Sequence, residues 1–424
     1  MKVIDFKTYL DNPLYLTNSE KKELYVYVDL KAALVEKETD RVPLNIAVVI
    51  DRSGSMSGEK LAYVKKATDF VIDNLNSDDY LSIVQYDNKV DVVSKSKAVT
   101  DKKRLHKKVA AIKAGGMTNL SGGMLEGYTQ VGRSKSDKYV NRVLLLSDGL
   151  ANEGITDPEK LRTIAQKRFR EQTIGLSTFG VGSGFNELLM TNLAEYGGAN
   201  YYFIDMPDRI PEIFAKELEG LLSVVAQNAK LKIDFPSSYL KCTKVFGYPA
   251  VINEASVDVN FNDIFSEEQK AILLKFEIQR KIDEPLKLKM DLSYDDVAET
   301  LDKVHISETL MLKPTSDKSA VEQSIHALTY QNITLFEANA SYDQAMLLAD
   351  KREFEAAKKL VTKAILMIEN SLKMYPDSAE LSKQLEELKS YEKKLEEMKS
   401  YSRGEMQMAQ KSSRMANYKL RKKR

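Results

Sequence analysis

The sequence predicts an α/β fold class in which a doubly wound, Rossmann-like domain is inserted in a β-sandwich and followed by an α-helical C-terminal region. Short apolar runs alternate with amphipathic stretches in residues 44–228. Apolar and polar residues alternate one by one on both sides of that segment, and beyond Pro314 the apolar residues recur at helical spacing. The first pattern is typical of a sheet with crossover helices. The second is typical of half-buried strands, and the third of packed helices.

The central segment contains apolar runs that we interpret as buried parallel strands. They are residues 44–50, 80–86, 143–146, 174–181 and 200–204. Between them, apolar residues fall at helical spacing, as in the series Leu61, Val64, Thr68, Val71 and Leu75. This alternation of strands and helices predicts a doubly wound α/β domain.

The flanking segments have the period of half-buried strands. Residues 24–34 form one long alternating run. The same period returns in residues 231–235, 257–261, 272–278 and 286–292, as in successive antiparallel strands of a sandwich. Because a lone N-terminal strand is not stable by itself, we expect residues 24–34 to join the later sheet. The α/β domain would then be inserted between them.

Past Pro314 the sequence predicts helices. One apolar stripe runs through residues 354–368 and ends before Pro376, and another runs through residues 381–398. We expect these helices to pack as a hairpin in a bundle or short coiled coil. The basic run at residues 419–424 is typical of a solvated, frayed tail, and docking on an acidic partner or nucleic acid is the alternative.

These patterns divide the chain into segments. We predict an N-terminal β segment that joins the later sandwich, an α/β domain, a β-sandwich domain and an α-helical C-terminal region with a basic tail. Their bounds are residues 1–42, 43–227, 228–313 and 314–424.

Composition narrows the class of protein. With 63 Lys and Arg against 62 Asp and Glu, the net charge is +1, so nucleic acid is not an expected partner. The single cysteine, Cys242, cannot form an internal disulfide, and three scattered histidines provide no zinc-ligand spacing. Neither a signal peptide nor an apolar run long enough to cross a bilayer is evident. We therefore expect a cytoplasmic protein without a transmembrane segment.

Three short polar motifs indicate a binding site. They are Asp51-Arg52-Ser53-Gly54-Ser55, Gly115-Gly116-Met117-Thr118-Asn119 and Ser147-Asp148-Gly149. The first and third directly follow predicted strands, where open α/β sheets bind ligands. Because adjacent parallel strands end at the same edge of a sheet, we expect the three loops to converge.

The candidate metal ligands are all hard oxygen donors: Asp51, Ser53, Ser55, Thr118 and Asp148. Hydroxyls and carboxylates without sulfur or imidazole suit Mg²⁺, and also Mn²⁺ or Ca²⁺. If the hydroxyls bind directly and a carboxylate acts through water, the ion keeps uncompensated positive charge and favours an anionic oxygen. An Asp or Glu of a protein partner could supply that oxygen.

These motifs resemble the metal-ion-dependent adhesion site of von Willebrand factor A (VWA) domains, and all five ligand positions match. The resemblance implies that the hydroxyls hold the ion, that the aspartates act directly or through water, and that a ligand carboxylate completes the shell. The motifs Phe179-Gly180-Val181-Gly182 and Gly198-Ala199-Asn200-Tyr201-Tyr202-Phe203 are similar to those of bacterial calcium-activated chloride-channel-like proteins and inter-alpha-trypsin inhibitor heavy chains. The resemblance covers most of residues 24–313.

The sequence therefore predicts a metal-dependent protein-binding module, an intracellular adaptor or assembly subunit rather than an enzyme. Analogy with bacterial relatives suggests an AAA-type ATPase system as a partner. One alternative is a metal-dependent hydrolase or phosphotransferase, although the loops offer no histidine or additional carboxylate pair as a general base. The other is a structural subunit that uses the fold without metal.

Overall fold

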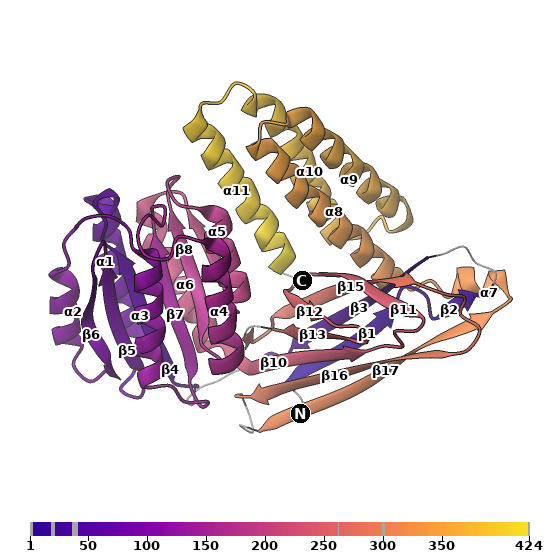
Figure 1. Cartoon of the computed structure of the whole chain (residues 1–424), viewed down its shortest axis with the longest axis horizontal. Helices are drawn as coiled ribbons and strands as arrows, with labels where there is room; N and C mark the ends of the chain where they lie inside the picture. Colours follow the sequence, from indigo (N-terminus) through magenta and orange to yellow (C-terminus); the bar gives the residue numbers. More distant parts are fainter. Residues whose placement is uncertain (1–2, 18–21, 36–40, 262, 299–301, 423–424) are drawn as a thin grey trace.

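The structure is a computed structural model that describes residues 3–17, 22–35, 41–261, 263–298 and 302–422. Figure 1 shows an α/β domain on the left, a β-sandwich at the lower right and a group of helices above the sandwich. The last helix, α11 (Arg403–Lys422), lies between that group and the α/β domain. The predicted fold class is confirmed.

The α/β domain is built on a six-stranded sheet in the order β6-β5-β4-β7-β8-β9. Its strands are β4 (Leu44–Asp51), β5 (Tyr80–Tyr86), β6 (Val90–Ala98), β7 (Val140–Ser147), β8 (Gly175–Val181) and β9 (Tyr201–Ile204). All neighbours are parallel except β5 and β6, so the sheet is mixed. The prediction missed β6 because this edge strand is rich in polar residues and lacks an apolar run.

Helices cover both faces of this sheet because successive strand residues point to opposite sides. In β4, Ile46 and Val48 belong to one buried core, and Ala47 and Val49 belong to the other. The first core is covered by α1 (Glu59–Asn74), α2 (Lys102–Ala110) and α6 (Ile210–Leu222), and the second by α3 (Leu120–Arg133), α4 (Pro158–Gln172) and α5 (Glu187–Tyr196). Two short 3₁₀ turns complete the domain, η1 (Gly54–Met56) and η2 (Pro207–Arg209).

The sandwich contains a four-stranded and a seven-stranded sheet. The first is β1 (Ile4–Leu10), β3 (Glu23–Ala32), β15 (Gln269–Ile278) and β11 (Leu240–Phe246), in the order β1-β3-β15-β11. The second is β12 (Ala250–Ile252), β13 (Ser256–Asn260), β10 (Val224–Asp234), β16 (Leu286–Asp296), β17 (Lys303–Thr315) and β2 (Leu14–Leu16) in spatial order, with β14 (Ile264–Phe265) paired to β10. Inward-facing apolar residues of both sheets share one core.

The N-terminal strand pairs with the later sheet. β3 lies antiparallel to β15, with Val28 opposite Ile272. The α/β domain is therefore inserted between β3 and β10, and β10 begins two residues after α6 ends. β3 lies between β1, which pairs with it from nearby in the sequence, and β15, which reaches it from beyond the α/β domain.

The C-terminal region contains α7 (Lys318–Gln323), α8 (Ala327–Asp350), α9 (Phe354–Met374), α10 (Ala379–Met398) and α11. α8, α9 and α10 share an apolar core, and Phe336 of α8 packs on the outer face of the four-stranded sheet. No helix among the described residues is both long enough and apolar enough to cross a membrane.

The prediction of a frayed tail at residues 419–424 is wrong as far as Lys422, because α11 continues to that residue. Tyr418, one residue before the basic run, is buried and accepts a hydrogen bond from the backbone of Tyr201. This contact anchors the end of the helix. The last part of the run, residues 423–424, lies outside the described residues.

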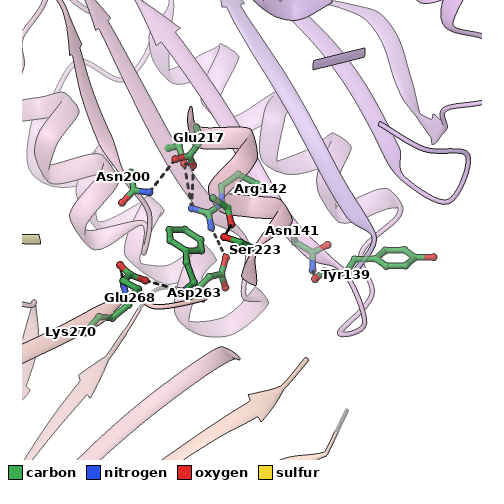
Figure 2. Close-up of polar contacts among 12 residues, drawn as sticks. Tyr139, Asn141, Arg142, Asn200, Glu217, Ser223, Asp263, Glu268 and Lys270 are labelled. Atoms are coloured by element: carbon green, nitrogen blue, oxygen red, sulfur yellow. Dashed lines mark hydrogen bonds and ion pairs between the residues drawn. The ribbon is translucent and has the colours of Figure 1, made fainter. Parts of the chain in front are cut away.

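A buried group of charges joins the base of the α/β domain to the sandwich, as Figure 2 shows. Arg142 of β7 is 1% exposed and donates to Asp263, at 2.5 Å, on the sandwich side. Its guanidinium also lies 3.9 Å from the carboxylate of Glu217, on α6. Burial raises the pKa of Asp263, and the positive charge of Arg142 opposes that shift. Because buried charges are costly unless paired, Arg142 compensates the burial of both carboxylates where the two domains meet.

Replacing Arg142 with methionine should strongly destabilise the chain, because Glu217 and Asp263 would lose their shared cation. We expect Arg142→Met to lower the free energy of unfolding by about 3–5 kcal/mol, measured by urea denaturation. Arg209→Met is the matched control, since Arg209 forms an exposed ion pair with Asp205, and such pairs contribute about 0–1 kcal/mol. Equal losses in the two variants would contradict the assigned role of Arg142.

Candidate metal centre

Two of the predicted loops begin at the carboxyl ends of neighbouring parallel strands. Asp51 is the last residue of β4, and Asp148 directly follows β7. The register pairs Ile50 with Leu146, so the two loops start side by side. This is the edge of an α/β sheet at which ligands usually bind.

Short polar contacts connect the carboxylates to the hydroxyls. The side chain of Asp51 accepts hydrogen bonds from the backbone nitrogen of Ser53, at 2.9 Å, and from the hydroxyl of Ser147, at 2.7 Å. The Ser53 and Ser55 hydroxyls lie 3.2 Å apart. The Ser55 hydroxyl donates to Asp148 at 2.6 Å. Four of the five predicted ligands therefore form one connected cluster.

Backbone hydrogen bonds bring the loop of Thr118 to the same place. Gly54 donates to the carbonyl of Gly116 at 2.9 Å, and Gly115 donates to the carbonyl of Arg52 at 2.6 Å. A Cβ atom placed on Gly149 would lie 3.2 Å from the Thr118 hydroxyl and 3.9 Å from the Ser55 hydroxyl. The structure thus brings all five predicted residues together around this small space.

The double glycine in the Thr118 loop has a steric reason. A Cβ atom on Gly115 would lie 1.9 Å from a carboxylate oxygen of Asp87, and one on Gly116 would lie 2.6 Å from the side-chain oxygen of Asn88. A larger residue at position 115 would push against Asp87 and shift this loop relative to Arg52. The requirement is strict at Gly115, because Asp87 is buried and bound to Arg52 and to the backbone of Gly116, whereas the exposed side chain of Asn88 can move away from Gly116.

The electrostatics of the cluster favour a cation. Asp51 is fully buried and Asp148 is 2% exposed. Burial raises the pKa of Asp51, hydrogen bonds from Ser53 and Ser147 lower it, and the charge of Asp148 raises it further. The ammonium of Lys60, on the first turn of α1, contacts Asp148. Two buried carboxylates so close together are stabilised by nearby positive charge.

The sequence interpretation did not assign roles to the residues that support these ligands. Ser147 orients Asp51, Lys60 contacts Asp148, and the Asn152 side chain accepts a hydrogen bond from the backbone of Thr118 at 2.9 Å. Because Ser147 directly precedes Asp148 in the third motif, the sequence could have indicated that Ser147 lies near the ligands. Lys60 and Asn152 carry no signal of this kind, because only the fold brings them to the loops.

The donor set suits a hard divalent ion. Carboxylate and hydroxyl oxygens are the ligands that Mg²⁺, Mn²⁺ and Ca²⁺ prefer. Across the described residues, no group of three or more His, Cys, Asp and Glu side chains is arranged to hold a metal. The cluster at the edge of the sheet differs from such groups, because it combines two carboxylates with three hydroxyls.

The remaining reactive side chains lie apart from this cluster. Burial raises the pKa of the Cys242 thiol, in the sandwich, to about 11, which disfavours the nucleophilic thiolate. His106 contacts Asp69 and Asp73, and His326 contacts Thr329. These side chains have structural partners of their own.

The fold and the position of the polar cluster define a class: a Rossmann-like α/β domain with adhesion-site motifs at the carboxyl edge of its sheet. The family model of the von Willebrand factor type A domain matches residues 45–216. This part of the chain is a VWA domain, and the predicted family resemblance is confirmed.

Known proteins agree with this assignment. YfbK of Escherichia coli strain K12 is 30% identical over 216 residues, which cover 50% of this chain and 37% of YfbK. Inter-alpha-trypsin inhibitor heavy chain H3 of Rattus norvegicus is 27% identical over 222 residues, which cover 49% of this chain and 24% of the heavy chain. The chain thus matches less than half the length of either relative.

A solved structure shares most of the architecture. A von Willebrand factor type A protein from Catenulispora acidiphila has a TM-score of 0.72 and 15% sequence identity, and the match covers 90% of this chain and 89% of that one. At this identity the likeness concerns the fold. It extends beyond the VWA domain into the sandwich and the helices.

Metal binding should stabilise the folded chain, because the ligands converge only in the folded state. We expect MgCl₂ at about 100 times its dissociation constant to add about 2.7 kcal/mol to the free energy of unfolding. Asp148→Asn should abolish this gain, and Asp208→Asn, at an exposed acidic residue on η2, should retain it. Differential scanning calorimetry with MgCl₂ and with EDTA measures the effect. A Mg²⁺-dependent gain that persists in Asp148→Asn would argue against the ligand set.

Proposed function

We propose that this chain is a metal-dependent protein-interaction module whose ion, held by Asp51, Ser53, Ser55, Thr118 and Asp148, binds a carboxylate of a partner protein. The convergence of these oxygen donors at the carboxyl edge of the sheet is the observation that carries the proposal. Ser55 is solvent-exposed, while Asp51 and Thr118 are buried. The cluster is therefore anchored inside the domain and open on its outer side.

The donor set supports carboxylate binding. A divalent ion held there would supply a Lewis-acid position with an affinity for anionic oxygen. The hydroxyls of Ser53, Ser55 and Thr118 add no negative charge, so the cluster offers only two carboxylates, one of which also contacts Lys60. An Asp or Glu side chain of the partner would bring the missing charge.

The surroundings of the cluster support a protein partner. Met117 precedes Thr118 and is 53% exposed, and Leu150 follows Gly149 and is 57% exposed. Apolar side chains next to a charged centre are typical of the contact region of a protein interface. The partner segment that we propose therefore presents an acidic residue flanked by apolar residues.

The proposal includes an intracellular setting, in which the chain acts as an adaptor or assembly subunit. The buried, unpaired thiol of Cys242 is compatible with a reducing compartment. An AAA-type ATPase system as the partner belongs to the same proposal, by analogy alone.

Two alternatives remain distinguishable. A metal-dependent hydrolase or phosphotransferase would need a general base beside the ligands. Lys60, Ser147, Asn152 and Tyr86 contact the cluster, and none of these four is a carboxylate or a histidine. A metal-free scaffold would bind its partner equally well after replacement of both Asp51 and Asp148.

Capture of the partner should require both the ion and the Thr118 hydroxyl. The full chain, immobilised and incubated with lysate of its native cell, should retain the partner in MgCl₂ and release it in EDTA. Thr118→Ala should lose the partner while keeping the native circular dichroism spectrum, and Thr163→Ala, at an exposed residue of α4, should retain it. If Thr118→Ala retains the partner, and the unaltered chain retains it in EDTA, the proposal is disproved. Turnover of phosphate or ester substrates that vanishes in Asp148→Ala would favour the hydrolase or phosphotransferase.

The apolar neighbours of the cluster should contribute to partner affinity without changing metal binding. We expect Met117→Ser with Leu150→Ser to weaken binding of the isolated partner about tenfold, since removing two apolar contacts costs on the order of 1–3 kcal/mol. The Mg²⁺ dissociation constant from calorimetry should not change. Leu366→Ser, at an exposed leucine of α9, is the control. An unchanged partner affinity would show that the interface does not include this rim.

A further inference from the structure

The last helix of the chain packs on the VWA domain with one face and on the helical region with another. Met415 and Tyr418 of α11 are buried in the core between the sheet and helices α3, α4 and α5. The Tyr391 hydroxyl donates to the side chain of Gln410 at 3.0 Å, and the Asn417 side chain donates to Asp343 at 2.7 Å. Helix α11 thus connects the VWA domain to the helical region (Figure 1). It makes apolar contacts with the VWA domain and polar contacts with α8 and α10.

A buried lysine of α11 holds a loop of the VWA domain. Lys411 is 5% exposed, and its ammonium donates to the carbonyls of Ser183, at 3.0 Å, and Phe185, at 2.8 Å. It also lies 3.4 Å from the centre of the Phe185 ring. These carbonyls flank Gly184 on both sides, so Lys411 fixes the path of the chain around that glycine.

The same glycine is pressed against a predicted metal ligand. A Cβ atom on Gly184 would lie 2.7 Å from the backbone carbonyl oxygen of Asp148. The loop of residues 182–185 thus packs against the backbone carbonyl of Asp148. The carboxylate of the same residue contacts Ser55. A continuous series of contacts runs from Lys411 through Gly184 to Asp148.

We propose that Lys411 is a positioning residue for the metal centre, so that docking of α11 on the VWA domain and binding of the ion strengthen each other. The inference rests on the proposed metal site. By thermodynamic linkage, the factor by which docked α11 tightens metal binding equals the factor by which the ion tightens docking. The helical region would thereby respond to the occupancy of a site on another domain.

The choice of lysine at position 411 supports this role. A buried ammonium is costly, and a methionine would fill the same space beside Phe185 without that cost. Burial lowers the pKa of Lys411 to about 8, with Glu187 opposing the shift. What lysine adds over methionine is the pair of hydrogen bonds to the loop carbonyls. The neighbouring Arg414 reinforces the contact by bonding to Glu187, the first residue of α5, at 2.8 Å.

The test is the affinity of the full chain for MgCl₂ alone, measured by isothermal titration calorimetry. Lys411→Met keeps the apolar packing and removes the hydrogen bonds, and we expect it to weaken Mg²⁺ binding about tenfold, the lower range for residues that support metal ligands. Lys393→Met, at an exposed lysine of α10, should bind Mg²⁺ as the unaltered chain does. Gly184→Ala acts on the same contact without touching α11 and should also weaken binding.

Hydrogen exchange provides a second measurement that a purely structural role would not change. In the unaltered chain, MgCl₂ should slow amide exchange in residues 411–418, and in Lys411→Met this slowing should disappear. Equal Mg²⁺ affinities in Lys411→Met and Lys393→Met, with binding intact, would overturn the coupling and leave the proposed function standing. Absence of Mg²⁺ binding by the unaltered chain would overturn both.

Discussion

Parallel pairing of β4 with β7 is the interaction on which the candidate site depends. It places the end of one buried strand beside the end of another, so that Asp51 and the Ser147-Asp148 pair meet at one edge of the sheet. Both strands are buried along their whole length, since helices cover both faces of the sheet. The apolar cores therefore hold a polar cluster in place at the point where the strands end, and the loops contribute hydroxyls around it.

The burial that holds this cluster also sets its electrostatics. Asp51 and Asp148 lie close together with little access to water, and their charge is balanced by hydrogen bonds and by Lys60. A similar arrangement recurs at the opposite end of the domain, next to the sandwich. There Arg142 lies between the carboxylates of Glu217 and Asp263. One cluster is open toward solvent and suited to a ligand. The other is enclosed where the two domains meet (Figure 2).

Much of the fold, and the convergence of the five candidate residues at one edge of the sheet, could be predicted because the patterns behind them are local. Buried parallel strands are apolar throughout, and the three motifs occur at their ends or in a glycine-rich loop. Edge strand β6 escaped prediction because its polar residues suppress the apolar signal. The supporting residues Lys60 and Asn152 were missed for another reason: each reaches the site from a different element, and their spacing in the sequence says nothing about that contact.

The sequence by itself determined which residues are available for a metal centre, since the period of the strands and the chemistry of the three motifs are local properties. Only the tertiary structure decided what surrounds that centre. Three contacts join residues far apart in the chain. They are the pairing of β3 with β15, the contact of Arg142 with Asp263, and the hydrogen bonds of Lys411 to the loop that packs on Asp148. Such contacts depend on how complete elements pack. Burial and hydrogen bonding lower the free energy when groups are close in space, whatever their separation along the chain.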